Sequence, residues 1–375
     1  MLLRYRACLW SGLLGCALSM PFVRAADLPP TPSVPAQHDA GPGQTAAAST
    51  GNRKGSAMKD SDIPTPTPKD SWGLKPLDEM TAQDKYKGED GGLYGGGNNQ
   101  PPAALLKAAL AETAQIKPLD AKGAPDPQGK IGFISFGMSN TTQEFQTFLQ
   151  LAHNDTSLSP QLTIVDGAQG GKEARAWATT PVDQAGSPWQ VLDQRLAKAN
   201  LSAQQVQACW MLLAVAQPSL PMNGAEYPGH TDMFRKFVTE CLQRLKQRYP
   251  NLRIVFVSSR NYAGYATTPL NPEPFAYEYG FAVRRMILDQ AGGNADLNFQ
   301  AARGPVKAPA LIWGPYLWAD GMTKRKDGLF YVREDFVDAD HTHPSETGRK
   351  KVADRLLAFL KTDPASKPWF TRAQP

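Results

Sequence analysis

Three side chains in this sequence have the types and spacing that acyl transfer through a serine nucleophile requires. Asp340 and His343 are three residues apart, immediately before a predicted helix at 345–361. A carboxylate at that spacing can accept a hydrogen bond from one imidazole nitrogen while the other nitrogen faces a cleft. Ser139 follows an apolar run and Gly137, and glycine permits a tight turn that presents the serine at a helix N-terminus. We therefore predict Ser139 as nucleophile, His343 as general base and Asp340 as orienting acid.

Each half of this site has an alternative interpretation. In the first, Ser139, Thr141 or Thr142 simply caps a helix, because serine and threonine are favoured at that position. In the second, the C-terminal cluster is a metal site formed by Asp338, Asp340, His341 and His343. The other histidines have no ligand-like spacing, and both halves fall at the same edge of one predicted sheet, so we favour catalysis without a metal or other cofactor.

A glycine pair follows the second predicted strand. A phosphate-binding loop is excluded there, because Asp166 stands where its first glycine belongs and Glu173 stands where a magnesium-binding Ser or Thr is needed. Two adjacent glycines, Gly170 and Gly171, can instead let a backbone amide approach a reacting oxygen.

Short apolar runs alternate with amphipathic stretches between these motifs. The predicted strands, rich in aliphatic, β-branched and aromatic residues, lie at 131–136, 162–165, 208–215, 254–258 and 311–313. Apolar residues at helical spacing predict helices at 143–153, 233–249, 274–290 and 345–361. Strand, helix and strand in this order predict a three-layer α/β/α domain around a parallel sheet of about five strands. In such sheets ligands bind beyond the carboxyl ends of the strands.

The N-terminal residues have the pattern of an export signal. Two arginines precede an apolar stretch that ends near Val23, and Ala25 closes a site of the kind that signal peptidases cleave. We predict a signal peptide at 1–25 and an exported protein, periplasmic or secreted, without a transmembrane anchor. Lipidation at Cys16 is a less favoured alternative, because the apolar run continues past that cysteine.

Composition indicates how the rest of the chain is organised. Residues 26–83 are rich in Pro, Thr, Ser, Ala and Gly without apolar periodicity, so we predict a disordered linker and then one domain at 84–375. A formal net charge of +5 in 375 residues is too balanced to indicate a nucleic-acid partner. We expect a monomer that binds an ester-bearing small molecule or a glycan. After signal cleavage Cys209 and Cys241 remain. The sequence is compatible both with a disulfide between them and with two buried thiols.

At the motifs described above, the sequence resembles the SGNH, or GDSL-type, hydrolases, which are serine esterases on a flavodoxin-like α/β/α fold. The resemblance covers 86–370 and is nearest to a group of bacterial exported SGNH-like proteins. It rests on GGLYGGG (91–97), GMSNTTQEF (137–145), SSRNYAGYATTPLNPEPFAYEYGF (258–281) and WGPYLWADG (313–321). It implies Ser139 as nucleophile, His343 as general base and Asp340 as orienting acid. It also implies Gly170 and the Ser139 amide as oxyanion donors.

One block departs from the pattern of that family. The family places an Asn after the third strand as a side-chain oxyanion donor, whereas the spacing here puts Val215 at that position. Losing one such donor typically costs about 3 to 4 kcal/mol of transition-state stabilisation. Gln217 and Asn261 are the candidates for a substitute donor.

Together these patterns predict an exported serine esterase that removes a small acyl group, acetyl in our hypothesis, from a carbohydrate or a cell-envelope glycan. The alternative is a catalytically weak or inactive glycan-binding protein on the same fold. Tyrosines after the fourth strand are suited to a sugar, although turn and loop packing also recruits such residues. The residues that we expect to contact the substrate are Asn140, Gln169, Gly171, Tyr262 and Tyr265.

Overall fold

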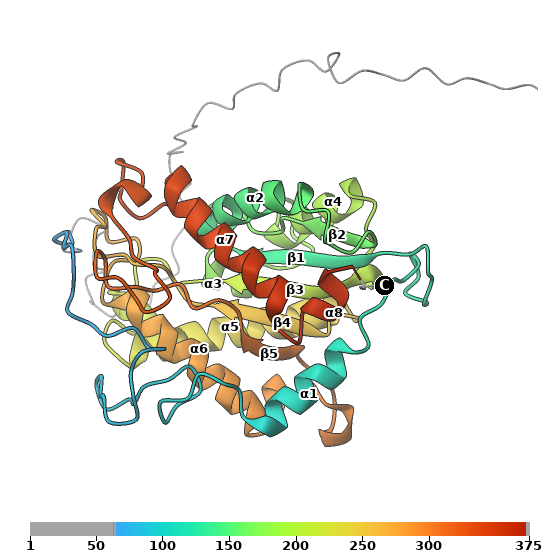
Figure 1. Ribbon diagram of the computed structural model, residues 1–375, viewed down its shortest axis with the longest axis horizontal. Coiled ribbons are helices and arrows are strands. Elements are labelled where there is room, and N and C mark those ends of the chain that lie inside the picture. The colour runs from blue at the N-terminus through green and yellow to red at the C-terminus, as the bar shows by residue number, and fades with distance from the viewer. Residues whose placement is uncertain (1–62, 64, 373–375) are drawn as a thin grey trace, which may run out of the picture. The chain divides into compact units, whose positions relative to one another are not determined.

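The computed structural model of this chain describes residue 63 and residues 65–372. The predicted signal peptide, the alternative lipidation site Cys16 and most of the predicted linker lie outside the described residues. Five parallel strands form one sheet in the order β2-β1-β3-β4-β5 (Figure 1). The strands are β1 (Ile131–Gly137), β2 (Leu162–Val165), β3 (Val206–Leu212), β4 (Ile254–Ser258) and β5 (Ala310–Trp313). The predicted five-stranded parallel sheet is confirmed.

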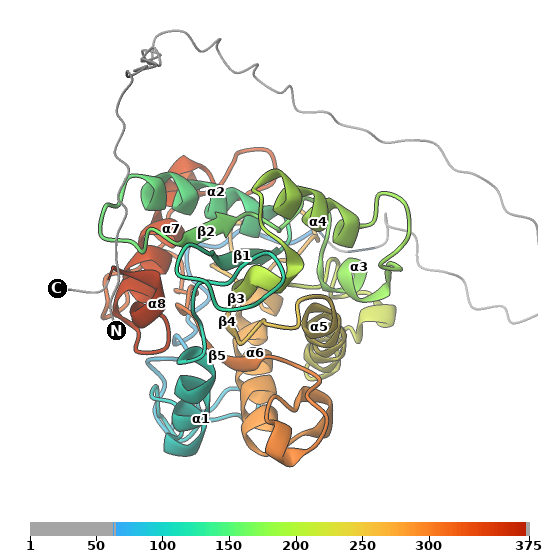
Figure 2. The ribbon, with the colours of Figure 1, turned by 90° about the vertical axis from the view of Figure 1, so that its right-hand side faces the viewer.

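Helices cover both faces of the sheet, as Figure 2 shows. One face carries α1 (Ala103–Thr113), α2 (Ser139–His153), α7 (Glu346–Thr362) and α8 (Lys367–Phe370). The other face carries α3 (Ala174–Thr179), α4 (Pro188–Lys198), α5 (Gly229–Arg248) and α6 (Phe275–Ala291). Short 3-10 turns lie at Ala203–Gln205, Pro221–Asn223, Ala295–Leu297, Ala301–Arg303 and Arg333–Asp335. The protein therefore has the predicted three-layer α/β/α architecture.

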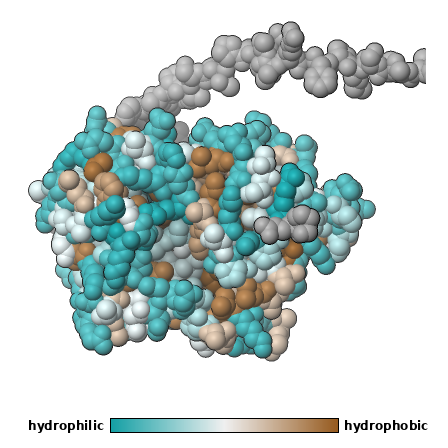
Figure 3. Space-filling view, viewed as in Figure 1, coloured by the Kyte–Doolittle hydropathy of each residue, from teal (hydrophilic) through white to brown (hydrophobic). Residues whose placement is uncertain are grey.

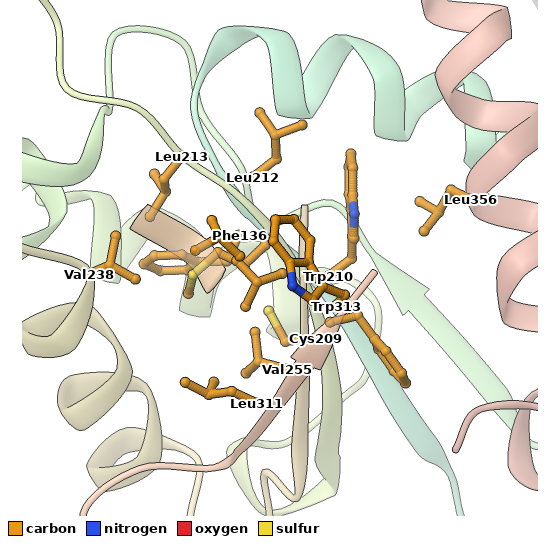
Figure 4. Packing of buried hydrophobic residues seen from close by; sticks show 14 of the residues in the cluster. Phe136, Cys209, Trp210, Leu212, Leu213, Val238, Val255, Leu311, Trp313 and Leu356 are labelled. Carbon is orange, nitrogen blue, oxygen red and sulfur yellow. The ribbon is translucent and has the colours of Figure 1, made fainter. Parts of the chain in front are cut away.

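Apolar residues from adjacent strands form the core. β1 and β3 are buried along their whole lengths, because helices cover both faces of the sheet. Cys209 pairs with Ile134 of β1 and with Val255 of β4, and Figure 4 shows Cys209 and Val255 close to Trp210. Cys209 and Cys241 are both buried, free thiols, so the second of the two cysteine alternatives is the one found.

The predicted elements are present with some changes at their ends. β2 and β4 have the predicted bounds, whereas β3 ends at Leu212 because its partner β4 ends opposite, at Ser258. Helix α2 begins at Ser139, four residues before the predicted start at 143. The prediction missed this first turn because the turn is polar and has no apolar residues at helical spacing. Helices α1, α3, α4 and α8 were missing from the prediction. Each has 11 residues or fewer, so its apolar pattern covers only a few turns.

Residues 65–100, which we call the N-terminal strap, pack against the domain. Leu77 is 0% exposed, and its amide donates a hydrogen bond to the Tyr316 hydroxyl at 3.2 Å. The Asp320 carboxylate accepts hydrogen bonds from the Ser71 hydroxyl at 2.5 Å and from two strap amides at 2.7 and 2.9 Å. This corrects the predicted linker: 65–83 belong to the domain, because a few apolar and capping side chains suffice to order a proline-rich stretch.

The surface carries few large apolar side chains. Most of the face in Figure 3 is hydrophilic, with apolar residues in small separate groups. Among the described residues, the large hydrophobic side chains that are exposed are Met222, Val306 and Met322. No helix in the described part of the chain combines the length and the apolar character that crossing a bilayer requires.

Candidate active site

The turn from β1 into α2 presents Ser139 as the first residue of the helix. Gly137 has no room for a side chain, since a Cβ atom would lie 2.2 Å from the Leu212 carbonyl oxygen and 2.3 Å from the Thr141 hydroxyl oxygen. The Thr141 hydroxyl donates to the Leu212 carbonyl at 2.6 Å and accepts from the Met138 amide at 3.1 Å. The turn is therefore pinned to the end of β3. Thr141 supplies the capping contact, which leaves the serine hydroxyl available.

Ser139, His343 and Asp340 form a continuous hydrogen-bonded chain. Ser139 Oγ lies 2.8 Å from His343 Nε2, and His343 Nδ1 lies 2.5 Å from Asp340 Oδ2. An imidazole with its proton on Nδ1 donates to the carboxylate and accepts from the serine hydroxyl, which is the arrangement that a general base needs. The His343 and Asp340 side chains are 23% and 19% exposed, so the base can be reached from solvent.

Hydrogen bonds hold the Asp340 carboxylate in its ionised form. Its Oδ1 accepts from the backbone amides of Thr342 at 2.9 Å and His343 at 3.0 Å. Burial raises the pKa of this carboxyl, but the hydrogen bonds from the His343 ring and the two amides outweigh burial and lower the pKa to about 2. A carboxylate here stabilises the imidazolium that forms when His343 accepts a proton.

Two hydrogen bonds tie the loop that carries Asp340 and His343 to its neighbours. The Asn140 side-chain amide donates to the Thr342 carbonyl at 2.9 Å, and Asn140 is 2% exposed. The Thr267 amide donates to the Asp340 carbonyl at 3.0 Å. Asn140, which we predicted to contact the substrate, lines the pocket and also joins the serine turn to the histidine loop.

A pocket of about 320 Å³ lies beside the triad. The residues that line it are Met138, Ser139, Asn140, Gly171, Glu173, Ala214, Val215, Ala216, Arg260, Leu270, Asn271, Thr342 and His343. A larger hollow of about 750 Å³, lined by His153 and Arg372 among others, contains no triad residue. The smaller pocket is the candidate active site, because it is the one that the serine–histidine pair faces.

The loop after β2 reaches this pocket through Gly171, whose φ of +69° is a conformation that favours glycine. Gly170, the predicted oxyanion donor, is exposed beside Gly171 in this loop, and its role stays a prediction. The predicted contact residue Gln169 is not among the lining residues. Gln169 is 7% exposed, and its side-chain amide donates to the Pro188 carbonyl at 2.8 Å. Its backbone amide donates to the Gly137 carbonyl at 3.1 Å, so Gln169 anchors the loop instead.

Val215 lines the pocket on the side where the resemblance expects an amide donor. Neither proposed substitute lines it: Gln217 lies outside, and Asn261 is 1% exposed and donates to Glu144 at 3.3 Å. The lining residue Asn271 uses its Nδ2 on the Val215 carbonyl, at 3.1 Å. Backbone amides at the start of α2 and in the glycine loop are N–H groups that can serve an oxyanion there.

Tyr262 and Tyr265 are buried away from the pocket, contrary to the prediction that they contact a substrate. Both are 0% exposed, and their rings pack edge to face with centroids 5.1 Å apart. The Tyr262 hydroxyl donates to the Lys69 carbonyl at 2.7 Å, and the Tyr265 hydroxyl donates to the Tyr331 carbonyl at 3.1 Å. Both tyrosines therefore serve in loop packing, the alternative to sugar contact that the sequence left open.

Arg260 lines the pocket and was missed in the sequence. It is 1% exposed, and its Nε and Nη2 atoms have no hydrogen-bond partner among the described residues. Burial raises the pKa of two carboxyls whose charges act on Arg260, that of Glu144 to about 8 and that of Glu273 to about 7. One feature of the sequence could have identified Arg260 as a pocket residue: it lies two residues beyond the carboxyl end of β4, where ligands bind in parallel sheets.

The alternative metal site is not assembled. His341 Nε2 lies 3.8 Å from Asp338 Oδ1, whereas Asp340 and His343 bond to each other. In the described part of the chain, no group of three or more His, Cys, Asp or Glu side chains is placed to hold a metal ion.

No protein-family model matches this chain, and no curated protein matches it. Solved structures with a similar chain course include a lipase from a goat rumen metagenome, 13% identical, with a TM-score of 0.36 over 61% of this chain and 97% of that chain. A protein described as a GDSL-like lipase from Parabacteroides merdae is 14% identical, with a TM-score of 0.31 over 61% and 94%. A family two carbohydrate esterase from Clostridium thermocellum, solved in complex with cellohexaose, is 14% identical, with a TM-score of 0.32 over 64% and 65%. At this identity the likeness does not extend to chemistry, which must be argued from the pocket.

Proposed function

We propose that this protein is an exported serine esterase that removes a small acyl group, acetyl in our hypothesis, from a carbohydrate or a cell-envelope glycan. The observation that carries the proposal is the chain from Ser139 Oγ to His343 Nε2 at 2.8 Å and from His343 Nδ1 to Asp340 Oδ2 at 2.5 Å. The pocket beside it, of about 320 Å³, is at the small end of the range for ligand sites, which suits a short acyl group.

The proposed reaction has two halves. In the first, His343 Nε2 accepts the Ser139 proton while Oγ attacks the ester carbonyl carbon, and the tetrahedral intermediate then expels the alcohol, which takes the proton from His343. In the second, His343 deprotonates a water molecule that attacks the acyl-serine, and Ser139 leaves as the restored alcohol. Asp340 keeps its negative charge throughout and stabilises the imidazolium in both halves.

Backbone amides hold the oxyanion in this mechanism. The Ser139 N–H belongs to the first turn of α2, where no carbonyl of the helix accepts it, and the helix dipole favours negative charge there. Gly171 lines the pocket, and its backbone amide is the second donor in this proposal. Val215 offers no side-chain donor, so we expect turnover to be slower than with three donors by roughly a hundred- to a thousandfold.

A glycan-binding protein with weak or no catalysis is the second candidate, and Val215 is the observation that favours it. The two candidates respond differently to Val215→Asn. In an esterase, an added amide donor raises kcat on an aryl acetate by about tenfold or more. In a protein that only binds its ligand, the same substitution leaves hydrolysis at the background rate.

The test of the esterase proposal uses the full chain with an aryl acetate and with an acetylated glycan. We expect hydrolysis that both Ser139→Ala and His343→Ala abolish, with thermal unfolding midpoints close to that of the wild type. Hydrolysis that persists in purified Ser139→Ala would place the chemistry elsewhere. A folded wild type that hydrolyses neither substrate would favour the binding protein.

Export is a separate part of the proposal and is supported by the sequence pattern at 1–25 alone. Expression in a bacterial host followed by N-terminal sequencing tests it. We expect a mature chain that begins at Ala26 in the periplasm or the medium. A cytoplasmic chain that retains residues 1–25 would contradict export.

A further inference from the structure

Arg260 places a buried guanidinium in the wall of the catalytic pocket. It shares that pocket with Ser139 and His343 and is 1% exposed. Nε and Nη2 are buried without a hydrogen-bond partner in the described part of the chain. Nη1 also makes no hydrogen bond to a described residue, so no described residue satisfies the guanidinium in the pocket wall.

An unpaired guanidinium at such a site is costly. It carries five N–H donors, and burial removes water from them without returning hydrogen bonds. The carboxyls of Glu144 and Glu273 do not form an ion pair with it, and burial shifts both toward the neutral form. The pocket's own carboxylate, Glu173, accepts hydrogen bonds from the Arg175 and Ala176 amides at 2.9 Å and so caps α3. Among the described residues, no carboxylate lies within ion-pair distance of Arg260, and the charges of Glu144, Glu273 and Asp340 act on it only from further away.

We propose that Arg260 binds a carboxylate of the substrate, so that the preferred ester carries a carboxylate close to the bond that is cleaved. This inference rests on the proposed esterase function and adds the substrate class to it. A guanidinium presents parallel N–H groups that match the two oxygens of a carboxylate, and such charge-assisted pairs are strong. Ala214, Val215 and Ala216 make one wall of the pocket apolar, and a low local dielectric strengthens such a pairing.

The carboxylate can come from either side of the ester. On the alcohol side, it belongs to an acetylated uronic acid of an acidic glycan. On the acyl side, it belongs to a hemiester of a dicarboxylic acid. Both sources present the same group to Arg260, and matched substrates distinguish them.

The test compares kcat/KM for two pairs of esters with the full chain. The alcohol-side pair is an acetylated methyl galacturonoside and the corresponding acetylated methyl galactoside. The acyl-side pair is 4-nitrophenyl hydrogen succinate and its neutral methyl ester. We expect the wild type to prefer the anionic member of at least one pair by about 10- to 100-fold, the range of a charge-assisted hydrogen bond. The pair that shows the preference identifies the source.

Arg260→Gln and Arg260→Lys are the variants, and Lys172→Gln is the matched control. Lys172 follows Gly171 and is only partly buried, so its removal takes away the same charge near the pocket without the buried contact. We expect Arg260→Gln to abolish the preference, Arg260→Lys to retain part of it and Lys172→Gln to keep it. A preference that is absent in the wild type or unchanged in Arg260→Gln overturns the proposal. An equal loss on the anionic and neutral esters also overturns it, because Arg260 then serves the reaction and not recognition.

A binding measurement separates this inference from the esterase proposal and from misfolding. Calorimetry with Ser139→Ala measures affinity for free galacturonate and for succinate without turnover. We expect binding of one of them that weakens about 10-fold or more when Arg260→Lys is added, at an unchanged thermal midpoint. Binding in a chain that hydrolyses no ester supports the carboxylate site while the esterase proposal fails. No binding of either anion counts against the site even if neutral esters are hydrolysed.

Discussion

Two buried arginines of this molecule lie in contrasting surroundings. Arg284 of α6, 3% exposed, donates to the Asp90 carbonyl at 2.7 Å, to its carboxylate at 3.1 Å and to the Gly92 carbonyl at 3.2 Å. It also donates to the Glu89 carboxylate at 2.6 Å. Arg260, 1% exposed, makes no hydrogen bond to any described residue.

The difference separates a structural cation from a functional one. Where Arg284 meets the N-terminal strap, the fold supplies carboxylates and carbonyls that satisfy the guanidinium, so its N–H groups are not left without partners. At the pocket the fold supplies the burial without the partners, which costs free energy that a ligand can recover. A buried polar group left unsatisfied beside a nucleophile is thus a better guide to substrate chemistry than a satisfied one. The contrast predicts changes in activity at the pocket and changes in stability at the strap.

The largest expected effect is on catalysis, in Asp340→Asn. The asparagine oxygen can still accept hydrogen bonds from the two backbone amides. Its nitrogen, however, donates a hydrogen bond to His343 Nδ1 and so forces the ring proton onto Nε2. That tautomer cannot accept the serine proton, so kcat should fall by about 10⁴-fold. Steady-state kinetics on an aryl acetate checks it, with thermal unfolding as the control. Activity within tenfold of the wild type would show that Asp340 does not orient the base.

The next effect is on stability, in Arg284→Gln. The substitution leaves the Asp90 and Gly92 carbonyls without this donor in a buried setting, while the Glu89 carboxylate keeps only Arg285 and Tyr227. The free energy of unfolding should therefore fall by about 3 to 5 kcal/mol. Denaturant unfolding measures it. The selectivity between anionic and neutral esters should stay unchanged in the folded enzyme. A loss of selectivity here would remove the distinction between the two arginines.

A third effect, smaller at each single pH unit, concerns pH, through Glu144 beside Arg260. Its carboxyl has an ordinary pKa of 4.5, which burial raises to about 8 in the fold, against the opposing charges of Arg260 and Arg349. Between these values the folded state keeps a proton that the unfolded chain releases, so stability should fall by about 1.4 kcal/mol per pH unit.

Glu144→Gln does not titrate and removes this dependence. Relative to Glu144→Gln, the wild type should lose stability as pH rises from 5 to 8 and should change no further above that. Denaturant unfolding at several pH values measures the difference. A constant difference across this range would mean that Glu144 is ionised and neutralises Arg260, which would remove the contrast with Arg284.

The smallest effect concerns the hydrogen bond between Asn140 and the Thr342 carbonyl. Asn140→Ala removes a buried link of about 1 kcal/mol between the serine turn and the histidine loop. We expect kcat to fall about fivefold, and KM to stay near the wild-type value, because the link positions the triad. A rise in KM at constant kcat would instead mean that Asn140 binds the substrate directly.

Much of the sheet could be predicted because its strands are covered on both faces. Ile254 to Ser258 form a continuous apolar run that ends in a serine, and that composition fixes the strand's bounds. The first turn of α2 is polar, so spacing alone could not place its start at Ser139. The strap was misjudged because Leu77 is one apolar residue in a proline-rich stretch, and its burial depends on distant residues such as Tyr316.

The triad was predictable from local patterns, whereas the rest of the pocket was not. Asp340 and His343 are close in sequence, and the turn after Gly137 is a local signal. Arg260 could not be identified in this way. A buried arginine indicates a binding site only when the structure shows that it has no hydrogen-bond partner, and the sequence does not show this. Tyr262 and Tyr265 show the converse, since their hydroxyls bond to carbonyls that no spacing rule identifies.

The central claim is that Ser139 is a nucleophile activated by His343. The most direct measurement is labelling of the full chain with a fluorophosphonate, followed by peptide mass spectrometry to locate the adduct. We predict a single adduct on the peptide that contains Ser139, lost in Ser139→Ala and strongly slowed in His343→Ala. A folded wild type that is not labelled, or is labelled at another serine, would contradict the account.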